Sequence, residues 1–505
     1  MEQHEEKNGR VQLEAMRRQL PLELTAELSL PDYRSEISRL LWVRPTVLPP
    51  ERFIGGGKAD FSGCVRFCAL YTGPDAALYT AEWEENYAFS VPMDAFAGFD
   101  VARGVELQAE VMADALTGRV TGPRKLAVRC RMHATLYGYA DKNLCLPEAP
   151  ESNLCRLCEL QECSRLHTGT RELLSISEDA ECEGEVRVIG THGSVFLPEV
   201  SAGRDEILCK GELHLTLLLC KEGENAEKAH TVVRHLPFEQ SVICEGATPD
   251  CSARATATVG EITAAVEEGH ILLDAQILLN AEAVTQEAVL VCRDAFAPGH
   301  KSDCRFSEEA LRRITVCQNR HFSMNGELPL SQLKLPQDAR VLDCVADAEL
   351  REKSTDGERC VLAGELCVHV LYQAGEECGV CDAMFPWRSV CEASGAEPRA
   401  DVWVAVCRLS KTPDALRVDA ELQLSLLAES VSPISVLTEA KFDPVEGDIA
   451  PNDPEVYFPT TEETLWDVAK RYQRVPQALA AANALTAEAP AAPESLAGKK
   501  FLLIP

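Results

Sequence analysis

The sequence lacks any long run of apolar residues. No stretch approaches the roughly 18 apolar residues that indicate a membrane-spanning helix. Residues 1–20, MEQHEEKNGRVQLEAMRRQL, also lack the apolar region of a secretory signal peptide. We therefore expect neither a membrane span nor Sec-type export, and we predict a cytoplasmic protein.

Basic side chains are outnumbered, with 49 Lys and Arg against 80 Asp and Glu and a formal net charge of −31. Because phosphate groups are bound by clustered Lys and Arg, this balance argues against nucleic acid or an anionic membrane as the main partner. Hydrophobic residues make up 46% of the 505 residues, which is ordinary for globular proteins, so several packed domains are expected.

Catalytic motifs are also missing. The 11 histidines include no HExxH pair, and no GxSxG turn is present to expose a nucleophilic serine. The segment IGGGK, residues 54–58, lacks the spacing of a phosphate-binding loop. We therefore predict that the chain is not an enzyme and binds no cofactor. Two histidines, His214 and His369, lie in related strand-like runs and are interpreted as side chains on a sheet face.

Cysteine, in contrast, is abundant, with 22 residues along the chain. Many lie in strand-like runs, where a free thiol behaves as a small buried hydrophobe, and a reducing compartment fits this scatter. Cys145 and Cys163 flank the first of two CxxC pairs, Cys155/Cys158 and Cys378/Cys381. The candidates for a metal site are Cys155, Cys158 and Cys163, but their spacing is not that of a zinc ribbon, so we predict no metal. Redox cross-linking in a mature assembly stays open.

The main feature of the chain is an internal repeat. Three segments share a glycine followed by alternating apolar residues: GCVRFCALY from Gly63, GELHLTLLL from Gly211 and GELCVHVLY from Gly364. These glycines are 148 residues (63 to 211) and 153 residues (211 to 364) apart. A near-constant spacing of this size indicates three copies of a whole domain, not a solenoid of short repeats.

Each copy ends in a strand whose residues alternate in polarity. These strands cover residues 126–137, 273–280 and 416–426, and each follows a turn signal, TGP, EEGH or KTPD. Each glycine is also followed by an aromatic-bearing strand, with Trp83 and Tyr87, Phe238, or Phe385 and Trp387. Period-2 alternation predicts antiparallel sheets with one face in a core. We predict a mainly β protein with three repeated β-sandwich or open-barrel domains and a small C-terminal βααβ module.

The repeat also predicts the domain boundaries. We expect a charged N-terminal arm over residues 1–24, followed by repeats over 25–140, 171–297 and 318–441. The connections are a Cys-bearing linker over 141–170, a linker over 298–317 and an acidic linker over 442–455. Within the second linker, SEEALRRITVCQNR from Ser307 suggests a short helix.

Residues 456–505 form the predicted C-terminal module. One apolar stripe at helical spacing is made by Leu465, Val468, Ala469 and Tyr472. Thr460 or Thr461 would cap this helix, and a second helix would begin at Pro476. The apolar run 501–504 predicts a closing strand that pairs with residues 456–458.

This module resembles the LysM family, a βααβ unit best known for binding N-acetylglucosamine polymers. The matching residues are Thr464, Leu465, Trp466, Ala469, Tyr472, Asn483, Gly498 and the terminal Leu-Ile-Pro. Two features depart from the family pattern. Glu462 and Glu463 replace the usual Gly-Asp, and an Ala/Pro-rich insert, residues 484–495, replaces the short second loop. These departures favour a protein ligand over a glycan.

The whole arrangement carries a second resemblance. Tandem repeats with a G-x-L-x-V-x-V-L-Y strand, followed by a LysM-like module, resemble the SPOCS-domain proteins of endospore-forming Firmicutes, among them the SipL-like spore morphogenesis proteins. The resemblance covers about residues 25–440 and 456–505. It implies a protein of the mother-cell cytoplasm that helps to anchor coat layers at the forespore surface. It also implies that the LysM-like module contacts the spore-coat morphogenetic ATPase or another coat protein.

We predict that the partner binds the module at Glu462, Glu463, Thr464, Leu465, Trp466, Tyr472 and Asn483. Trp466 lies one position off the apolar stripe and is the expected contact, because aromatic side chains carry much of the energy of interfaces. Tyr472 lies on the stripe and is expected to fill the module core. Glu462 and Glu463 would favour a basic partner or stabilise the helix dipole.

Two other functions stay open at this point. A cell-wall protein or hydrolase accessory would use the module on peptidoglycan or N-acetylglucosamine, but it would need export and, for hydrolysis, catalytic residues. A phage-tail or baseplate component would also carry an intracellular LysM module, although the threefold repeat argues against it.

Overall fold

The computed structural model describes residues 9–144, 154–182, 186–221, 229–356, 359–393, 398–444, 455–460, 462–485, 496 and 499–505. Several features of the sequence analysis lie outside these residues. They are residues 1–8 of the arm, Cys145, Thr461, Gly498, and most of the acidic linker and of the Ala/Pro-rich insert.

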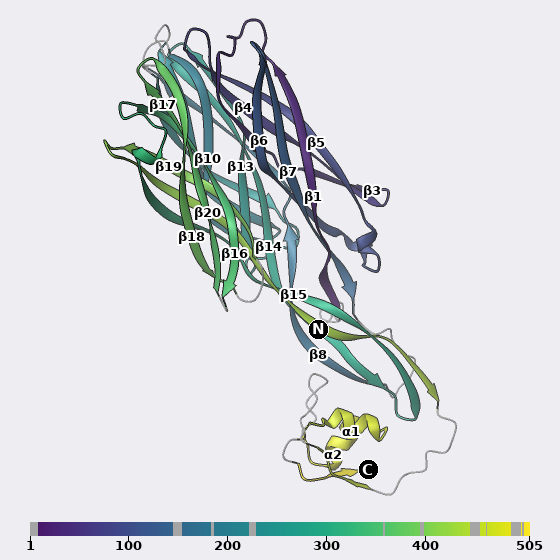
Figure 1. The fold of residues 1–505 in the computed structure, drawn as a ribbon. Coiled ribbons are helices and arrows are strands. Elements are labelled where there is room, and N and C mark those ends of the chain that lie inside the picture. Colours follow the sequence, from purple (N-terminus) through teal and green to yellow (C-terminus); the bar gives the residue numbers. More distant parts are fainter. Residues whose placement is uncertain are drawn as a thin grey trace.

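Three copies of one strand arrangement make up most of the chain, so the predicted mainly β fold is confirmed (Figure 1). Copy one, residues 10–143, consists of β1 (Arg10–Ser29), β2 (Arg39–Val47), β3 (Glu51–Gly55), β4 (Lys58–Thr72), β5 (Leu78–Pro92), β6 (Val105–Gly122) and β7 (Lys125–Asn143). Copy two, residues 155–296, consists of β8 (Cys155–Thr168), β9 (Glu172–Glu181), β10 (Val186–Ala202), β11 (Glu206–Lys221), β12 (His230–Ile243), β13 (Ser252–Glu267) and β14 (His270–Phe296). Copy three, residues 300–444, consists of β15 (His300–Pro329), β16 (Arg340–Asp356), β17 (Arg359–Ala374), β18 (Glu377–Glu392), β19 (Arg399–Lys411) and β20 (Ala415–Pro444). Short 3-10 helices lie at Asp94–Phe96, Val101–Arg103 and Leu330–Gln332.

Each copy contains two antiparallel sheets. The first sheet joins the first strand of the copy to its closing hairpin, in the orders β1-β7-β6, β13-β14-β8 and β15-β20-β19, and β9 also pairs with β14. The second sheet is a meander of the strands that lie, in sequence, between the first strand and the closing hairpin. Its central strand is β4 in copy one, between β2 and β5, β11 in copy two, between β10 and β12, and β17 in copy three, between β16 and β18. In copy one, β3 also pairs with β4, beside β2. Apolar residues from both sheets share one core in every copy, which is the predicted sandwich.

The closing strands bury the residues that the period-2 alternation predicts. The predicted turns join β6 to β7, β13 to β14 and β19 to β20. The buried residues are Leu126, Val128, Cys130, Met132, Ala134 and Leu136 in β7, Leu273, Ala275, Ile277 and Leu279 in β14, and Leu416, Val418, Ala420, Leu422, Leu424 and Leu426 in β20. Each large aliphatic side chain that leaves water in this way contributes about 2 kcal/mol to folding.

The repeat glycine has a steric role in all three copies. Each glycine pairs across the meander with an aromatic residue of the next strand, in the pairs Gly63 with Tyr87, Gly211 with Phe238 and Gly364 with Trp387. A Cβ atom on Gly211 would lie 2.8 Å from the Phe238 ring, and one on Gly364 would lie 2.8 Å from the Trp387 ring. The ring therefore covers the glycine, which explains why the two features recur together in the sequence.

The predicted N-terminal arm and the predicted linkers over 141–170 and 298–317 precede the three repeats in the sequence. These segments contain the first strand of each copy. β1 occupies most of the arm, β8 lies in the Cys-bearing linker, and β15 runs through the linker 298–317. The predicted helix from Ser307 is therefore wrong, because these residues lie inside β15. Its apolar residues Leu311 and Ile314 are buried in two different clusters, and residues 307–311 and 312–314 bury opposite faces of the strand. Where the buried face changes, the period-2 pattern is interrupted, and the three-residue spacing then resembles a helix.

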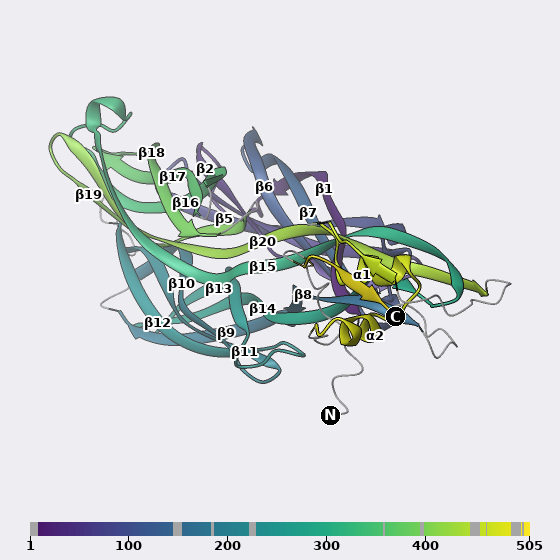
Figure 2. The ribbon, with the colours of Figure 1, turned by 90° about the horizontal axis from the view of Figure 1, so that it is seen from below.

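The three copies form a closed ring around a common axis. Three leucines, each seven residues after a repeat glycine, meet in one buried cluster together with residues from the first meander strand of each copy. The corresponding residues are Leu70, Leu218 and Leu371, and Leu41, Ile189 and Leu342. β5 contacts β10, β12 contacts β16, and β18 contacts β2, so every copy touches the other two. In Figure 2 copy two lies below, copy three at the upper left and copy one at the upper right.

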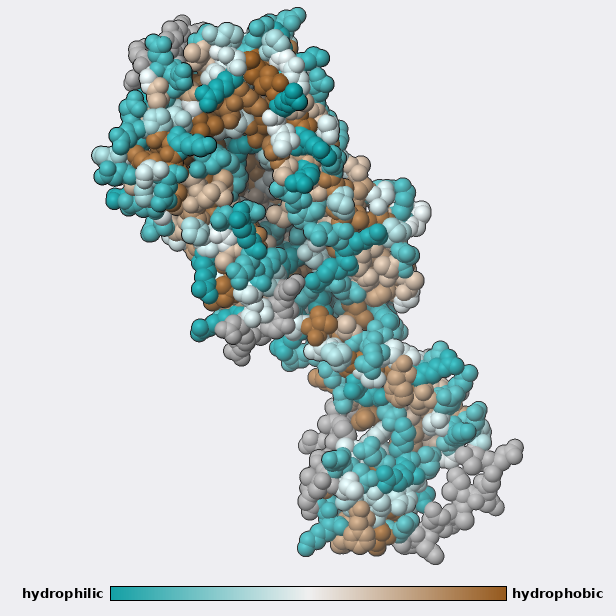
Figure 3. All heavy atoms as spheres, viewed as in Figure 1, coloured by the Kyte–Doolittle hydropathy of each residue, from teal (hydrophilic) through white to brown (hydrophobic). Residues whose placement is uncertain are grey.

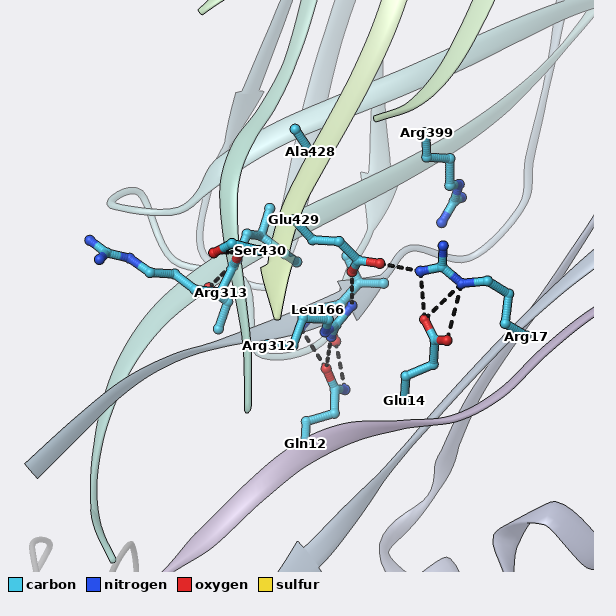
Figure 4. A network of polar contacts seen from close by, with 12 residues as sticks. Gln12, Glu14, Arg17, Leu166, Arg312, Arg313, Arg399, Ala428, Glu429 and Ser430 are labelled. Atoms are coloured by element: carbon cyan, nitrogen blue, oxygen red, sulfur yellow. Dashed lines mark hydrogen bonds and ion pairs between the residues drawn. The ribbon is translucent and has the colours of Figure 1, made fainter. Parts of the chain in front are cut away.

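The first strands also meet near the axis. Gln12, Ser164 and Arg312 occupy corresponding positions, because they pair with residues 141, 286 and 431 of their own closing strands. The Gln12 Oε1 atom accepts hydrogen bonds from the Leu166 amide and from Arg312, both at 2.8 Å (Figure 4). The Ser164 hydroxyl oxygen accepts from the Ile314 amide at 2.8 Å. Buried polar groups of three copies thus satisfy one another.

Charged residues continue this network. Glu282 of copy two accepts hydrogen bonds from Arg254 at 2.6 Å and from Arg399 of copy three at 3.0 Å, and Arg399 also pairs with Glu110 of copy one at 2.5 Å. Burial alone would raise the pKa of Glu282, but the two guanidinium groups outweigh it and lower the pKa to about 2. The three copies therefore share one buried ion-pair network. We refer to residues 10–444 as the body.

Candidate functional site

The C-terminal module has the predicted order of elements. β21 (Glu455–Tyr457) is followed by α1 (Leu465–Arg471), α2 (Pro476–Ala482) and β22 (Leu502–Ile504), and β21 and β22 pair antiparallel. Pro476 begins the second helix, as expected. Leu465, Val468 and Ala469 are buried in the module core.

The N-cap of α1 is Thr464, so the prediction of Thr460 or Thr461 is wrong. The Thr464 hydroxyl accepts a hydrogen bond from the Asp467 amide at 3.2 Å, and the Asp467 carboxylate accepts one from the Thr464 amide at 2.9 Å. This capping box places the first turn three residues later than the threonine pair suggested. Thr464 therefore has a structural role in the module.

Glu463 and Asn483 also make contacts within the module. The Glu463 carboxylate accepts from the Thr460 amide at 2.9 Å and the Tyr457 hydroxyl at 2.8 Å, and it pairs with Arg471 at 2.7 Å. The Thr460 amide, Tyr457 and Arg471 together lower the pKa of Glu463 to about 2. The Asn483 side-chain amide donates to the Leu503 carbonyl at 2.8 Å and accepts from the Leu503 amide at 2.6 Å.

Trp466 is covered by the body. Its side chain is 7% exposed, and its ring lies 5.0 Å from that of Phe296, centroid to centroid, in an edge-on arrangement. The Trp466 Nε1 group donates to the Asp294 carboxylate at 2.8 Å, and Lys470 reaches the same carboxylate at 2.7 Å. Asp294 follows an irregularity in the β14–β8 register, a feature that redirects side chains at strand ends. Trp466 therefore fastens the module to the body in this structure.

The other predicted residues differ in exposure. Tyr472 is the half-buried C-cap of α1 and packs edge-on against Tyr457 at 5.5 Å between ring centroids, in keeping with its expected place on the apolar stripe. Leu465 is buried in the module core, whereas Glu462 is exposed to solvent. Of the predicted set, Glu462 is thus the residue whose side chain is open to a partner without rearrangement.

An apolar face of the module was missed by the sequence analysis. Four large apolar side chains of the β21–β22 hairpin and its flanks are exposed, namely Phe458 at 70%, Phe501 at 54%, Val456 at 48% and Leu503 at 41%. Val456 and Leu503 pair directly across the two strands. We call these four residues the apolar hairpin face. Figure 3 shows apolar residues at the lower edge of the module, where this hairpin lies in Figure 1. The alternation of Leu502 and Ile504, buried, with Leu503, exposed, was the available signal.

The structure does not bring the candidate metal-binding cysteines together. Cys155, Cys158 and Cys163 lie along β8 and belong to three different clusters of apolar residues. At about 3.3 Å per residue, Cys155 and Cys163 are roughly 26 Å apart along the strand. Cys158 instead pairs with Cys292 across the sheet. The Cys292 thiol and Arg156 lower the pKa of Cys158 to about 7, against the opposing effect of burial.

The second copy matches a known family. Residues 186–267 match the family described as SipL, SPOCS domain. No curated protein and no solved structure matches the chain. The match begins at the first residue of β10 and ends at the last residue of β13, so the SPOCS segment comprises the meander of copy two and the strand that follows it. Copies one and three have the same meander and closing hairpin and the same glycine–aromatic pair.

The SPOCS segment also lines a large cavity of the body. This cavity has a volume of about 960 Å³ and lies between the three meanders. Polar side chains from all three copies line it, including Arg44 and Glu82 of copy one, His192 and His214 of copy two and Asp347 of copy three. Arg44 pairs with Asp347 at 2.7 Å across two copies. Among the described helices, none is long and apolar enough to cross a membrane.

Proposed function

We propose that this chain is a non-enzymatic scaffold in the assembly of the spore envelope. In this proposal the body provides rigid β surfaces, and the module docks a coat morphogenetic protein at the forespore surface, in the mother-cell cytoplasm. The match of copy two to the SipL, SPOCS domain supports a role in sporulation. The docking role extends the proposal beyond that match.

The apolar hairpin face is the observation that carries the docking role. Large exposed apolar side chains that lie next to one another are typical of interaction sites, because water leaves them at a gain in free energy when a partner covers them. The two phenylalanines supply the aromatic anchors that interfaces favour. Trp466 is already engaged by Asp294, so the docking surface is assigned to the hairpin and not to the first helix.

Glu462 and the net charge of −31 indicate that the binding surface of the partner should carry basic residues. A coat protein that presents an apolar patch with a Lys or Arg in reach of Glu462 would complement both the hairpin face and this carboxylate. The spore-coat morphogenetic ATPase is the partner that we would test first.

The experiment replaces both phenylalanines of the hairpin face, as Phe458→Ser with Phe501→Ser. Binding of the purified full-length chain to the purified coat ATPase is measured by calorimetry, and a fluorescent fusion is followed in sporulating cells. We expect binding to weaken at least tenfold and the fluorescent ring around the forespore to disappear. The matched control is Phe53→Ser, since Phe53 is 69% exposed on copy one, far from the module in sequence.

Two results would contradict the proposal. One is a double variant that binds the ATPase as the parent chain does and still forms the ring. The other is a parent chain that binds peptidoglycan sacculi and not the ATPase, which would move the function to the cell wall.

A further inference from the structure

Two histidines of copy two face each other on the meander sheet. His214 lies on β11 and His235 on β12, and the two residues are directly paired in the antiparallel register. Glu212 lies two residues before His214, so its side chain projects from the same face of β11. The alternate residues Leu213 and Leu215 are buried in the sandwich core, whereas His214 and His235 line the cavity between the copies. All three polar groups therefore lie on the side of the sheet that faces the cavity.

The three side chains are close enough to share one ion. The Glu212 carboxylate lies 3.2 Å from the His214 Nε2 atom and 3.3 Å from the His235 Nδ1 atom. One ligand atom from each residue lies within 4.8 Å of the other two, and the imidazole centroids are 4.4 Å apart. For a tetrahedral ion with bonds of about 2.0–2.1 Å, neighbouring ligand atoms are roughly 3.4 Å apart. The two distances between the carboxylate and the imidazoles are close to that value, and the three ligand atoms lie within 4.8 Å of one another.

His214 is poorly satisfied by protein groups alone. Its side chain is 10% exposed, and among the described residues its Nε2 atom has no partner with hydrogen-bonding geometry, although the Glu212 carboxylate lies nearby. A buried imidazole nitrogen that has no hydrogen-bond partner is available as a metal ligand.

The other copies show that the threefold framework does not require histidines here. The position three residues after the repeat glycine is Arg66 in copy one, His214 in copy two and Cys367 in copy three. Arg66 pairs across the sheet with Glu84 at 2.5 Å, which is a complementary ion pair. Two imidazoles do not form an ion pair of this kind, but a shared cation could bind both.

We propose that Glu212, His214 and His235 bind one divalent transition-metal ion of the zinc class. Two imidazoles and one carboxylate are a ligand set that such ions favour, and three protein ligands leave a coordination position open. The open position faces the cavity, where a water molecule or a small anionic ligand would complete the coordination. This site is independent of the proposed docking function.

Equilibrium dialysis of the full-length chain with Zn²⁺ tests the proposal. We expect the parent chain to bind one more equivalent than His214→Gln and one more than Glu212→Gln. The matched control is His270→Ala in the same copy, since His270 pairs with Asp179 outside the proposed site, and it should keep the parent stoichiometry. Circular dichroism verifies that each variant is folded. The Glu212 side chain is partly exposed, so Glu212→Gln still tests the site if His214→Gln fails to fold.

Co²⁺ distinguishes this site from the cysteines. Ligation by nitrogen and oxygen gives visible d–d absorption without the thiolate charge-transfer band, and we expect this spectrum to be lost in both site variants. Equal stoichiometry in the parent and site variants would overturn the proposal. The proposal would also be overturned if the Co²⁺ equivalent that is lost in the site variants shows a thiolate charge-transfer band, because cysteine would then be a ligand.

Discussion

Glu282 in the body and Asp294 at the module are both carboxylates of β14, yet they lie in different surroundings. Glu282 is 6% exposed and lies between Arg254 and Arg399, so removal of its charge takes away the carboxylate that these two buried cations share. The Asp294 side chain is 18% exposed and accepts hydrogen bonds from Trp466 and Lys470, which can return to water if the contact opens. The comparison teaches that the copies are joined by charges buried within the fold, whereas the module is held by a contact nearer to solvent.

The largest effect is expected from Glu282→Gln. The substitution removes the carboxylate that Arg254 and Arg399 share and leaves them paired with Asp401 and Glu110. The loss should therefore approach but not exceed about 3–5 kcal/mol, the cost of a fully broken buried ion pair. Denaturant unfolding followed by circular dichroism measures the change. Glu27→Gln, at an exposed position of β1, is the control and should be close to neutral. A loss below about 1 kcal/mol would show that the network does not join the copies.

The same carboxylate predicts a pH dependence. The folded-state pKa of Glu282 is about 2, below the ordinary value of about 4.3 for an unfolded chain. Its stabilising contribution is therefore complete above about pH 4.3 and is lost as the pH falls toward 2. The stability difference between the parent chain and Glu282→Gln should shrink over that range. A constant difference from pH 6 to pH 2 would contradict the assigned ion pairs.

An intermediate effect is expected from Asp294→Ala. The variant loses two hydrogen bonds, one of them to a charged amine, which together stabilise the contact by about 1.5–3 kcal/mol. Hydrogen exchange should accelerate in α1 while the body strands keep their protection. Asp303→Ala, at an exposed position of β15, is the matched control. Unchanged exchange in α1 would show that the module does not depend on this contact.

The smallest effect is expected from Thr464→Ala. Loss of the N-cap costs about 1 kcal/mol and should raise the exchange rate of the first turn of α1 only. Thr464→Ser retains the hydroxyl and should behave as the parent chain does. Binding of the coat ATPase should persist in both, because the apolar hairpin face lies on β21 and β22. A Thr464→Ala chain that loses binding would relocate the partner surface to the helix.

Patterns within single elements allowed much of the fold to be predicted. The period-2 alternation of β7, β14 and β20 and the helical stripe of α1 describe one face of one element against one core. The first strand of copy three was missed because the buried face of β15 changes between Leu311 and Arg312, which interrupts the alternation. The position of Trp466 was missed for a related reason, since its partner Asp294 is 172 residues away. The apolar hairpin face was hidden by the predicted pairing itself, which made all residues of the run 501–504 look like core.

The closed ring of three sandwiches has a consequence for stoichiometry. A homotrimer of the same shape would fall apart on dilution and would repeat every side chain three times. Here the copies are covalently joined, so the ring persists at any concentration, and each copy is free to differ. One position can therefore be an arginine, a histidine and a cysteine around the same axis. Asymmetry of this kind makes the three sides of the ring chemically different, so a partner that binds one side fixes the orientation of the whole chain.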